Sequence, residues 1–158
     1  YNAKKMPMKA HENILVFYKK LPVYHPQKTS GHTPVHAFTK TTEVQNKTDL
    51  YGKCSREVSG GGSTERYPRD VIQFASDKQN CHLHPTQKPV ALCEYLIRTY
   101  TDRDDVVLDS CMGSGTTGIA CLRTKRKFIG MEKEKTFFWI AKERIEMESS
   151  NTFADELF

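Results

Sequence analysis

A glycine-rich loop that follows an acid is the part of this sequence with the clearest chemical meaning. The stretch VVLDSCMGSGTTGIACL, residues 106–122, places Asp109 at the end of one apolar run and several glycines before the next. Glycines let a ligand approach the backbone closely, and the amide groups at the start of a helix attract negative charge. A second acid, Glu132, follows Gly113 by 19 residues. This combination predicts a site for a nucleotide-like ligand.

One interpretation of the loop is a dinucleotide site. The letters GSGTTG, residues 113–118, match the pattern Gly-x-Gly-x-x-Gly, and Glu132 lies where an acidic ribose ligand is expected. An NAD-dependent oxidoreductase therefore has to be considered. The loop is not a Walker loop, because no lysine follows Gly115, and Ser114 lacks the Gly-x-Ser-x-Gly frame of a nucleophile elbow.

Asp109 favours S-adenosylmethionine over a dinucleotide. A carboxylate about 4 Å from a pyrophosphate would cost about 4 kcal/mol of repulsion at an effective dielectric constant near 20. S-adenosylmethionine has no phosphate and carries a cationic ammonium and a cationic sulfonium, which an acid attracts. Glu132, at the end of the next predicted strand, can accept hydrogen bonds from ribose hydroxyls. The alternative is that Asp109 only caps the loop that follows it.

The elements around the loop predict a parallel sheet covered by helices. Apolar runs at 105–109 and 127–132 are typical of strands, and the stretches 116–124 and 135–148 are typical of helices. The last of these is amphipathic, with its apolar side formed by Phe137, Ile140, Ala141, Arg144 and Ile145. A β-α-β-α order with short connections predicts the α/β class. Ligands of such sheets bind beyond the carboxyl ends of the strands, where the glycine loop lies.

Upstream of these elements the pattern is less regular. Helical spacing of apolar residues begins near Thr86 and Pro89 and extends to Tyr100. The runs Glu12–Lys19 and Val71–Phe74 are expected to be strands, the first of them buried. Residues 25–66, rich in Lys, His, Thr and Gly, predict a loop-rich insertion. We therefore divide the chain into 1–24 as a strand region, 25–66 as the insertion, 67–148 as the ligand-binding α/β part and 149–158 as a tail without a readable pattern.

Composition limits the number of domains and the classes of protein and partner that remain possible. The 158 residues, 37% of them hydrophobic, suffice for one domain. Five cysteines, none spaced Cys-x-x-Cys, favour neither a disulfide framework nor a zinc ribbon, so we expect no metal and a reducing compartment. No stretch approaches the roughly 18 apolar residues of a membrane span, which favours a cytoplasmic protein that does not bind membranes. The net charge of +5 weakly favours a polyanionic partner.

Three motifs together resemble a known enzyme family. HPTQKP (84–89), LDSCMGSGTT (108–117) and FIGME (128–132) resemble the amino-group DNA methyltransferases whose motif order is permuted, so that the cofactor loop follows the catalytic motif. Residues 2–32 and 66–74 resemble the region after the catalytic motif in phage- and prophage-type adenine methyltransferases of this group. The resemblance covers most of the chain, is weak in the insertion and is absent in the tail.

The resemblance implies a fold, a cofactor and a substrate. The fold is the Rossmann-like, three-layer methyltransferase fold with a mostly parallel sheet, present here only in part, and the cofactor is S-adenosylmethionine. The substrate is adenine in duplex DNA, with cytosine as the alternative and a homodimer as one candidate assembly. The matching cofactor residues are His84, Thr86, Lys88, Pro89, Asp109, Gly113, Ser114, Gly115, Thr116, Thr117 and Glu132.

One part of the family pattern is missing. The chemistry of the family depends on an (Asp/Asn/Ser)-Pro-Pro-aromatic tetrapeptide that holds a flipped base. This sequence contains no Pro-Pro. Because the tetrapeptide would precede residue 12 and the chain begins at Tyr1 rather than Met, we expect a carboxyl-terminal portion that is inactive alone and has no catalytic residue of its own. The alternative is a degenerate relative that never had the motif.

Basic residues in and beside the insertion are candidates for DNA binding. In that position they could contact phosphates and read bases, whereas their other interpretation is a solvated surface. These candidates are Lys28, Lys40, Lys47, Lys53, Arg56 and Arg66. A nucleic-acid-binding module without catalysis is therefore a third hypothesis, which the intact cofactor loop disfavours.

Overall fold

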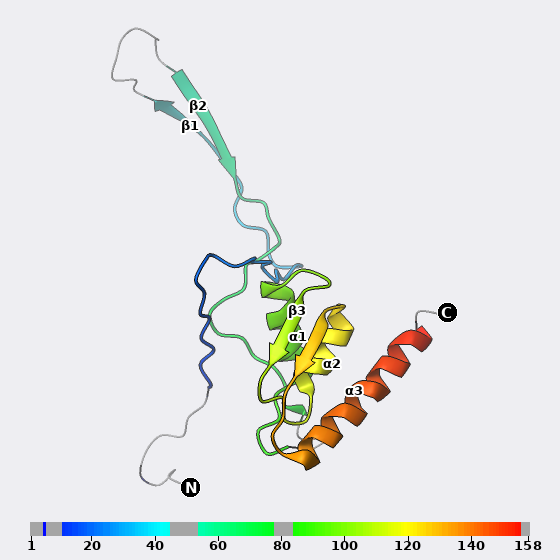
Figure 1. Cartoon of the computed structure of the whole chain (residues 1–158). Coiled ribbons are helices and arrows are strands. Elements are labelled where there is room, and N and C mark those ends of the chain that lie inside the picture. Colours follow the sequence, from blue (N-terminus) through cyan, green and yellow to red (C-terminus); the bar gives the residue numbers. More distant parts are fainter. Residues whose placement is uncertain (1–4, 6–10, 45–53, 78–83, 156–158) are drawn as a thin grey trace.

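A computed structural model describes residue 5 and residues 11–44, 54–77 and 84–155 of the chain. Its elements in chain order are β1 (Phe38–Val44), β2 (Cys54–Gly60), α1 (Val90–Tyr100), β3 (Val106–Asp109), α2 (Thr116–Thr124), β4 (Lys127–Gly130) and α3 (Lys135–Asp155). The last five form an α/β body, and the first two form a hairpin that projects away from it (Figure 1).

The α/β body is built around one β-α-β unit, as the sequence predicts. β3 and β4 pair in parallel, with Val107 opposite Phe128 and Asp109 opposite Gly130, and α2 connects them. The inward side chains Val107 and Phe128 pack against a core of Ile97, Ala120 and Cys121 from α1 and α2. Burial raises the pKa of the Cys121 thiol to about 11, so this cysteine is a neutral packing residue. The predicted α/β class is confirmed.

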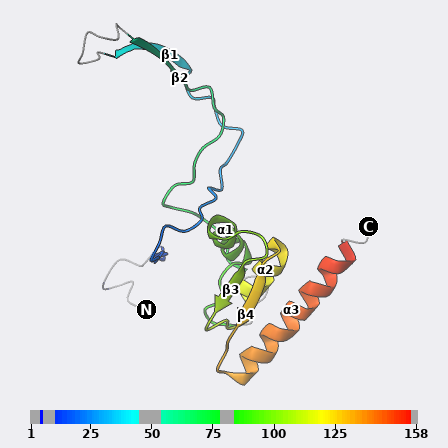
Figure 2. The ribbon, with the colours of Figure 1, turned by 45° about the horizontal axis from the view of Figure 1, so that its top comes forward.

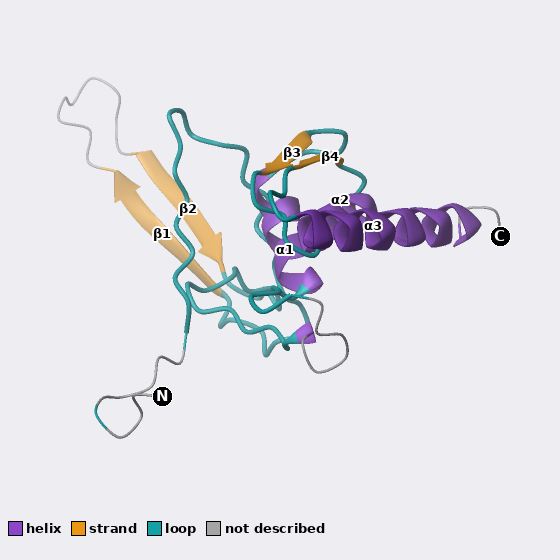
Figure 3. Ribbon diagram, turned by 60° about the horizontal axis from the view of Figure 1, so that its bottom comes forward, coloured by secondary structure: helices purple, strands orange, loops and turns teal. Residues whose placement is uncertain are grey.

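Helices cover only one face of this sheet within the described residues. Figure 3 shows α2 and α3 on the same side of the β3–β4 pair. On the opposite face Val106 and Leu108 are each 58% exposed, and Ile129 and Met131 are each 51% exposed. Alternation along the strands explains this division, because successive side chains point to opposite faces. The described body thus has two of the three layers that the family resemblance implies.

Helix α1 begins at Val90 and is capped by a residue that lies far away in the sequence. Pro89 occupies the N-cap position and offers no side-chain acceptor. Instead the Asp77 carboxylate accepts a hydrogen bond of 2.8 Å from the Val90 backbone N–H. Proline suits the start of a helix because it has no N–H to leave unsatisfied. The helix start near Pro89 is confirmed, whereas Thr86 lies ahead of the helix.

Helix α3 is longer than the sequence predicts. Residues 149–155, expected to be a tail without structure, continue the helix. No glycine or proline interrupts this stretch, so the backbone can extend the helix beyond the part that packs. Ala141 is fully buried, whereas Trp139 and Met147 on the other side are exposed, which confirms the predicted amphipathic face in the first half.

Two strands predicted from apolar runs are absent, and these predictions are wrong. Glu12–Lys19 and Val71–Phe74 are extended segments outside any strand. Phe17 is 87% exposed, and Leu15 and Val71 are exposed as well. An apolar run forms a buried strand only if another strand and a packed layer receive it. Within the described residues neither segment has such a partner.

The insertion contains an antiparallel hairpin that the sequence analysis missed. β1 and β2 pair from Phe38 opposite Gly60 to Val44 opposite Cys54. Threonine and valine in FTKTTEV have high β propensity, but this stretch lacks the alternation of apolar and polar residues by which strands are recognised. The hairpin extends from two adjacent connecting segments (Figure 2).

Those two connecting segments are held together by backbone hydrogen bonds and form what we call the neck, residues 29–37 and 61–66. Thr29 and Arg66 exchange bonds of 3.0 and 2.8 Å, and Val35 N–H donates to the Ser63 carbonyl at 3.0 Å. None of the helices in the described part is both long enough and apolar enough for a membrane span.

The cap of α1 gives a first prediction. Asp77→Ala should lower the free energy of unfolding by about 1 kcal/mol, because the first turn of α1 loses an acceptor. Asp77→Asn, which keeps an acceptor oxygen, should lose less. Urea unfolding followed by circular dichroism measures both, with the exposed Asp70→Ala as the control. Equal losses for the Asp77→Ala and Asp70→Ala variants would show that the bond to Val90 does not stabilise the fold.

Candidate functional site

The loop between β3 and α2, residues 110–115, depends on two glycines in the left-handed region. Gly113 has φ +52° and Gly115 has φ +79°. A Cβ atom on Gly115 would lie 3.0 Å from Cβ and 3.1 Å from Cα of Ala141 in α3. Gly115 therefore permits both the turn into α2 and the close approach of α3. A Cβ on Gly113 would meet only the His84 ring, at an ordinary 3.5 Å.

Asp109 lies at the carboxyl end of β3 and is bound from both sides. One carboxylate oxygen accepts a hydrogen bond of 3.1 Å from the Cys111 backbone N–H. The other accepts one of 2.7 Å from the Thr117 hydroxyl in the first turn of α2. The capping role considered from the sequence is thus present. Because each carboxylate oxygen has two lone pairs, both oxygens can still accept another bond.

Glu132 lies beyond the carboxyl end of β4 and holds the loop from the other side. Its carboxylate oxygens accept hydrogen bonds of 2.9 Å each from the Glu134 and Gly113 backbone N–H groups. These two bonds keep the pKa of the Glu132 carboxyl below its ordinary value, and the bond from Glu134 has the larger effect. The nearby His84 lowers this pKa as well. Glu132 is therefore ionised at neutral pH.

The segment His84–Pro89 borders the loop through its histidine. The His84 ring packs edge-on against Phe137 of α3, with centroids 4.3 Å apart. The Thr86 backbone N–H donates to Nδ1 of His84 at 3.2 Å, and the Thr86 hydroxyl lies 3.1 Å from the same nitrogen. Lys88, by contrast, forms an ion pair with Glu12. Of the predicted residues in this segment, His84 lies beside Gly113 of the loop, and Thr86 binds the histidine ring.

Ser114 of the loop and Thr116, the first residue of α2, are directed toward the protein interior. Ser114 is only 3% exposed, and its hydroxyl lies 3.5 Å from the amide oxygen of the buried Gln87. The Ser114 carbonyl accepts a hydrogen bond from the Arg144 guanidinium. Thr116 is buried as well. This geometry favours a role for Ser114 and Thr116 in holding the loop in place.

Sequence reasoning missed two residues that support the site. Arg144 holds the Ser114 carbonyl, and Phe137 supports the His84 ring. Both were assigned to the packed side of α3 but to no function. A cation on an otherwise apolar face is itself a signal, since a half-buried guanidinium needs acceptors.

The basic residues expected to bind DNA fall into separate groups. Lys28 pairs with Glu65 at 3.0 Å and lies 4.7 Å from the centre of the Tyr67 ring. Arg66 donates to the backbone carbonyls of Ser63, Glu65 and Thr33, which ties the neck together. Both cations are thus engaged by the protein itself. Lys40 and Arg56 belong to the strands of the hairpin, and Lys47 and Lys53 lie outside the described residues.

A comparison with known protein families identifies the family of this chain. The family model described as DNA methylase, of the N6/N4 type, matches residues 1–143. The chain belongs to the N6/N4 DNA methylase family. The match includes the glycine loop, both acids and the His84–Pro89 segment, so all the predicted cofactor residues of this chain lie inside the matched region.

Individual relatives and one solved structure are similar to parts of this chain. The Type II methyltransferase M2.DpnII of Streptococcus pneumoniae is 47% identical over 98 residues, which cover 62% of this chain and 33% of the relative. The Type II methyltransferase M.HpaI of Haemophilus parainfluenzae is 30% identical over 138 residues, 87% of this chain and 39% of the relative. A crystal structure of an M1.HpyAVI–SAM complex is 37% identical, with a TM-score of 0.46, over 67% of this chain and 44% of that one. The chain therefore spans less than half the length of these relatives.

The contact between the loop and α3 gives a second prediction. Gly115→Ala should destabilise the chain by about 2–5 kcal/mol, because left-handed strain adds to overpacking against Ala141. Gly113→Ala is the matched control, since it carries left-handed strain of about 1–2 kcal/mol without a close contact. Denaturant unfolding measures both.

Adding Ala141→Gly to Gly115→Ala tests the cause. Removal of the Ala141 methyl should recover part of the loss, although a glycine in the helix itself costs about 1 kcal/mol. Equal losses for the two single glycine variants would show that the approach of α3 does not require Gly115.

Proposed function

We propose that this chain binds S-adenosylmethionine at the glycine loop and supplies the cofactor-binding part of a DNA methyltransferase that modifies the amino group of adenine. The observation that carries the proposal is the pair of carboxylates, Asp109 and Glu132, at the carboxyl ends of two adjacent parallel strands. Both border the glycine loop, and Glu132 is joined to it by the hydrogen bond from the Gly113 N–H. Family membership supports the same proposal.

The charges of the site suit a cationic ligand. Neither Asp109 nor Glu132 is joined to a basic side chain by a described ion pair, and Lys88 is engaged by Glu12. The site is therefore acidic. Repulsion of about 4 kcal/mol per close pair at an effective dielectric constant near 20 would oppose a pyrophosphate, and attraction of similar size would favour an ammonium or sulfonium.

Each residue then has a distinct part in binding. Asp109, oriented by Thr117, would attract the ammonium end of the ligand, and Glu132 would accept bonds from ribose hydroxyls through its remaining lone pairs. His84, held by Phe137, would form one wall. S-adenosylmethionine supplies an electrophilic methyl group when bound. The residues of this chain hold and orient it, and none of them supplies a base-binding tetrapeptide.

The resemblance of residues 2–32 and 66–74 favours adenine in duplex DNA as the substrate. Methylation of the cytosine amino group would use the same parts of the enzyme, so cytosine is the alternative. The sequence contains no Pro-Pro-aromatic motif to hold an extruded base. We infer that the chain corresponds to the carboxyl-terminal portion of a permuted methyltransferase, in which a tetrapeptide ahead of residue 12 completes the active site.

The acid at the loop gives a third prediction. Asp109→Asn should weaken binding of S-adenosylhomocysteine by about 10- to 100-fold, because a charge-assisted hydrogen bond to the ammonium is lost. Binding of adenosine, which has no ammonium, should change little. Calorimetry with both ligands and with NAD measures this, with Asp70→Asn as the control. If Asp109→Asn weakens binding of S-adenosylhomocysteine and adenosine equally, Asp109 serves only as a cap of the loop. Tighter binding of NAD than of S-adenosylhomocysteine would favour an oxidoreductase.

The absent tetrapeptide gives a fourth prediction. The 158-residue chain should transfer no labelled methyl group to plasmid DNA, although it binds the cofactor product. A longer chain that carries an (Asp/Asn/Ser)-Pro-Pro-aromatic motif ahead of residue 12 should methylate it. Digestion of the DNA to nucleosides distinguishes N6-methyladenine from N4-methylcytosine. Robust transfer by the 158-residue chain would place catalysis among residues assigned here to binding.

A further inference from the structure

Ser114 lies between the two glycines that give the loop its left-handed turns. Gly113 has φ +52° and Gly115 has φ +79°, and glycine has more backbone conformations available than any other residue. Fixing such a stretch in one conformation costs entropy, so it stays in place only if other parts of the protein bind it. Ser114 is nevertheless only 3% exposed and therefore occupies a defined place in the interior.

Partners from two distant parts of the chain meet at Ser114. The Arg144 guanidinium of α3 donates to the Ser114 carbonyl. The amide oxygen of Gln87, which is itself only 7% exposed, lies 3.5 Å from the Ser114 hydroxyl. The bond from Arg144 is charge-assisted and is the stronger of the two, whereas the contact with Gln87 is at the outer limit of hydrogen-bond length. Of these two partners, Arg144 is therefore the main restraint on the loop.

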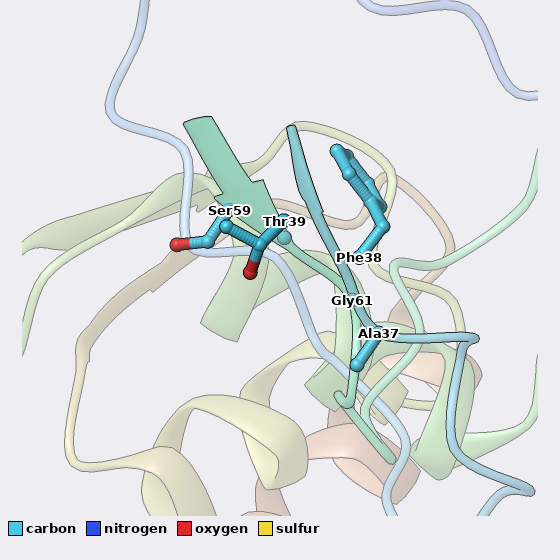
Figure 4. Close-up of a pocket in the computed structure, with 6 residues that line it drawn as sticks. Ala37, Phe38, Thr39, Ser59 and Gly61 are labelled. Carbon is cyan, nitrogen blue, oxygen red and sulfur yellow. The ribbon is translucent and has the colours of Figure 1, made fainter. Parts of the chain in front are cut away.

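Two open hollows of the described chain differ in what lines them. The larger, of about 500 Å³, lies at the base of the hairpin, and its lining residues 37–39 and 59–61 include no charged side chain (Figure 4). The smaller, of about 250 Å³, is lined by Val90, Ile119, Arg123, Arg144, Met147 and Glu148. Because this hollow is open, water can take the place of the guanidinium at the Ser114 carbonyl when Arg144 is replaced. Loss of the Arg144 bond should thus release the loop without unfolding the helices around it.

The two acids of the site are held by other bonds. Asp109 ends β3 and Glu132 follows β4, and the parallel pairing of these strands fixes the backbone that carries both. Thr117 orients the Asp109 carboxylate. The loop lies outside the strands, so its position depends on the residues that bind it from elsewhere. A ligand that touches both the loop backbone and the acids therefore needs a restraint that sets one relative to the other, and the Arg144 bond is such a restraint.

We propose that Arg144 is a positioning residue for S-adenosylmethionine. By holding the Ser114 carbonyl, it places the backbone of residues 112–115 where a cofactor bound to Asp109 and Glu132 also meets the loop. This inference rests on the proposed function and adds to the site a residue of α3 that acts without touching the ligand. A site that is ordered beforehand binds more tightly, because the ligand does not have to order it.

The test removes the bond in the full 158-residue chain and measures binding of S-adenosylhomocysteine by calorimetry, at a temperature where circular dichroism shows that the variants are folded. Arg144→Met keeps a long side chain but has no donor, and it should weaken binding about tenfold. Arg144→Lys keeps the charge and should recover part of the affinity, although lysine lacks the planar fork of arginine. Arg144→Gln, whose amide is too short to reach the loop, replaces Arg144→Met if the methionine variant does not fold.

Arg123→Met is the matched control. Arg123 lines the same hollow, and it pairs with Glu148 at 2.6 Å and with Glu94 at 3.5 Å. These ion pairs join the helices and do not involve the loop. Because exposed ion pairs contribute little, the Arg123→Met variant should lose some stability and keep its affinity for S-adenosylhomocysteine within about twofold.

Hydrogen exchange gives a second measurement that does not need a ligand. The Gly115 amide donates to the Met112 carbonyl at 2.8 Å, and the Met131 amide donates to the Asp109 carbonyl at 2.9 Å. In the Arg144→Met variant the Gly115 amide should exchange faster, because the loop opens locally, and the Met131 amide should exchange as before. A change limited to the loop would not arise from a general loss of stability.

The outcomes separate this inference from the proposed function. Unchanged affinity in Arg144→Met, or in Arg144→Gln where that variant replaces it, overturns the inference. Equal losses for Arg144→Met and Arg123→Met overturn it as well. In both cases, binding of S-adenosylhomocysteine by the unmodified chain still supports the cofactor site. If the unmodified chain binds no S-adenosylhomocysteine, the cofactor proposal fails and the inference fails with it, and exchange of the Gly115 amide then shows only whether Arg144 holds the loop.

Discussion

The approach of helix α3 to the backbone of Gly115 is the constraint on which the candidate site depends. Because Gly115 has no Cβ, Ala141 lies directly against the loop. That contact brings Arg144 to the Ser114 carbonyl and Phe137 to the His84 ring. One helix thereby positions the loop and the segment that borders it. The acids at the strand ends need no such support, since Thr117 and Gly113 bind them locally.

The elements that could be predicted from the sequence are those stabilised by neighbours close in the chain. β3, α2, β4 and the first half of α3 follow from apolar periodicity and short connections, because each packs on the next. Glu12–Lys19 shows the limit of this reasoning. An apolar run indicates that burial is favourable, but it does not show that a partner strand is present. The hairpin shows the reverse case, in which cross-strand pairing forms strands although the sequence has no alternation of apolar and polar residues.

The same distinction applies to the site. Asp109 and Glu132 were predicted because position at a strand end and charge suffice to give them a chemical role. Ser114 has the same place in the motif, yet its hydroxyl faces the interior, and only the tertiary contact with Gln87 shows this. Lys28 and Arg66 could not be separated from the other basic residues by composition. Their partners, Glu65 and the carbonyls of the neck, become neighbours only when the chain folds back on itself.

The bare face of the sheet has a consequence for how this polypeptide behaves in water. Val106, Leu108, Ile129 and Met131 form a flat apolar row, each more than half exposed. Hydration of such a surface is unfavourable by roughly 25 cal/mol per Å². A monomer therefore gains free energy by covering this row with any apolar surface it meets, and the gain grows with concentration. Association in water is thus favoured by the face of the sheet that the described helices leave uncovered.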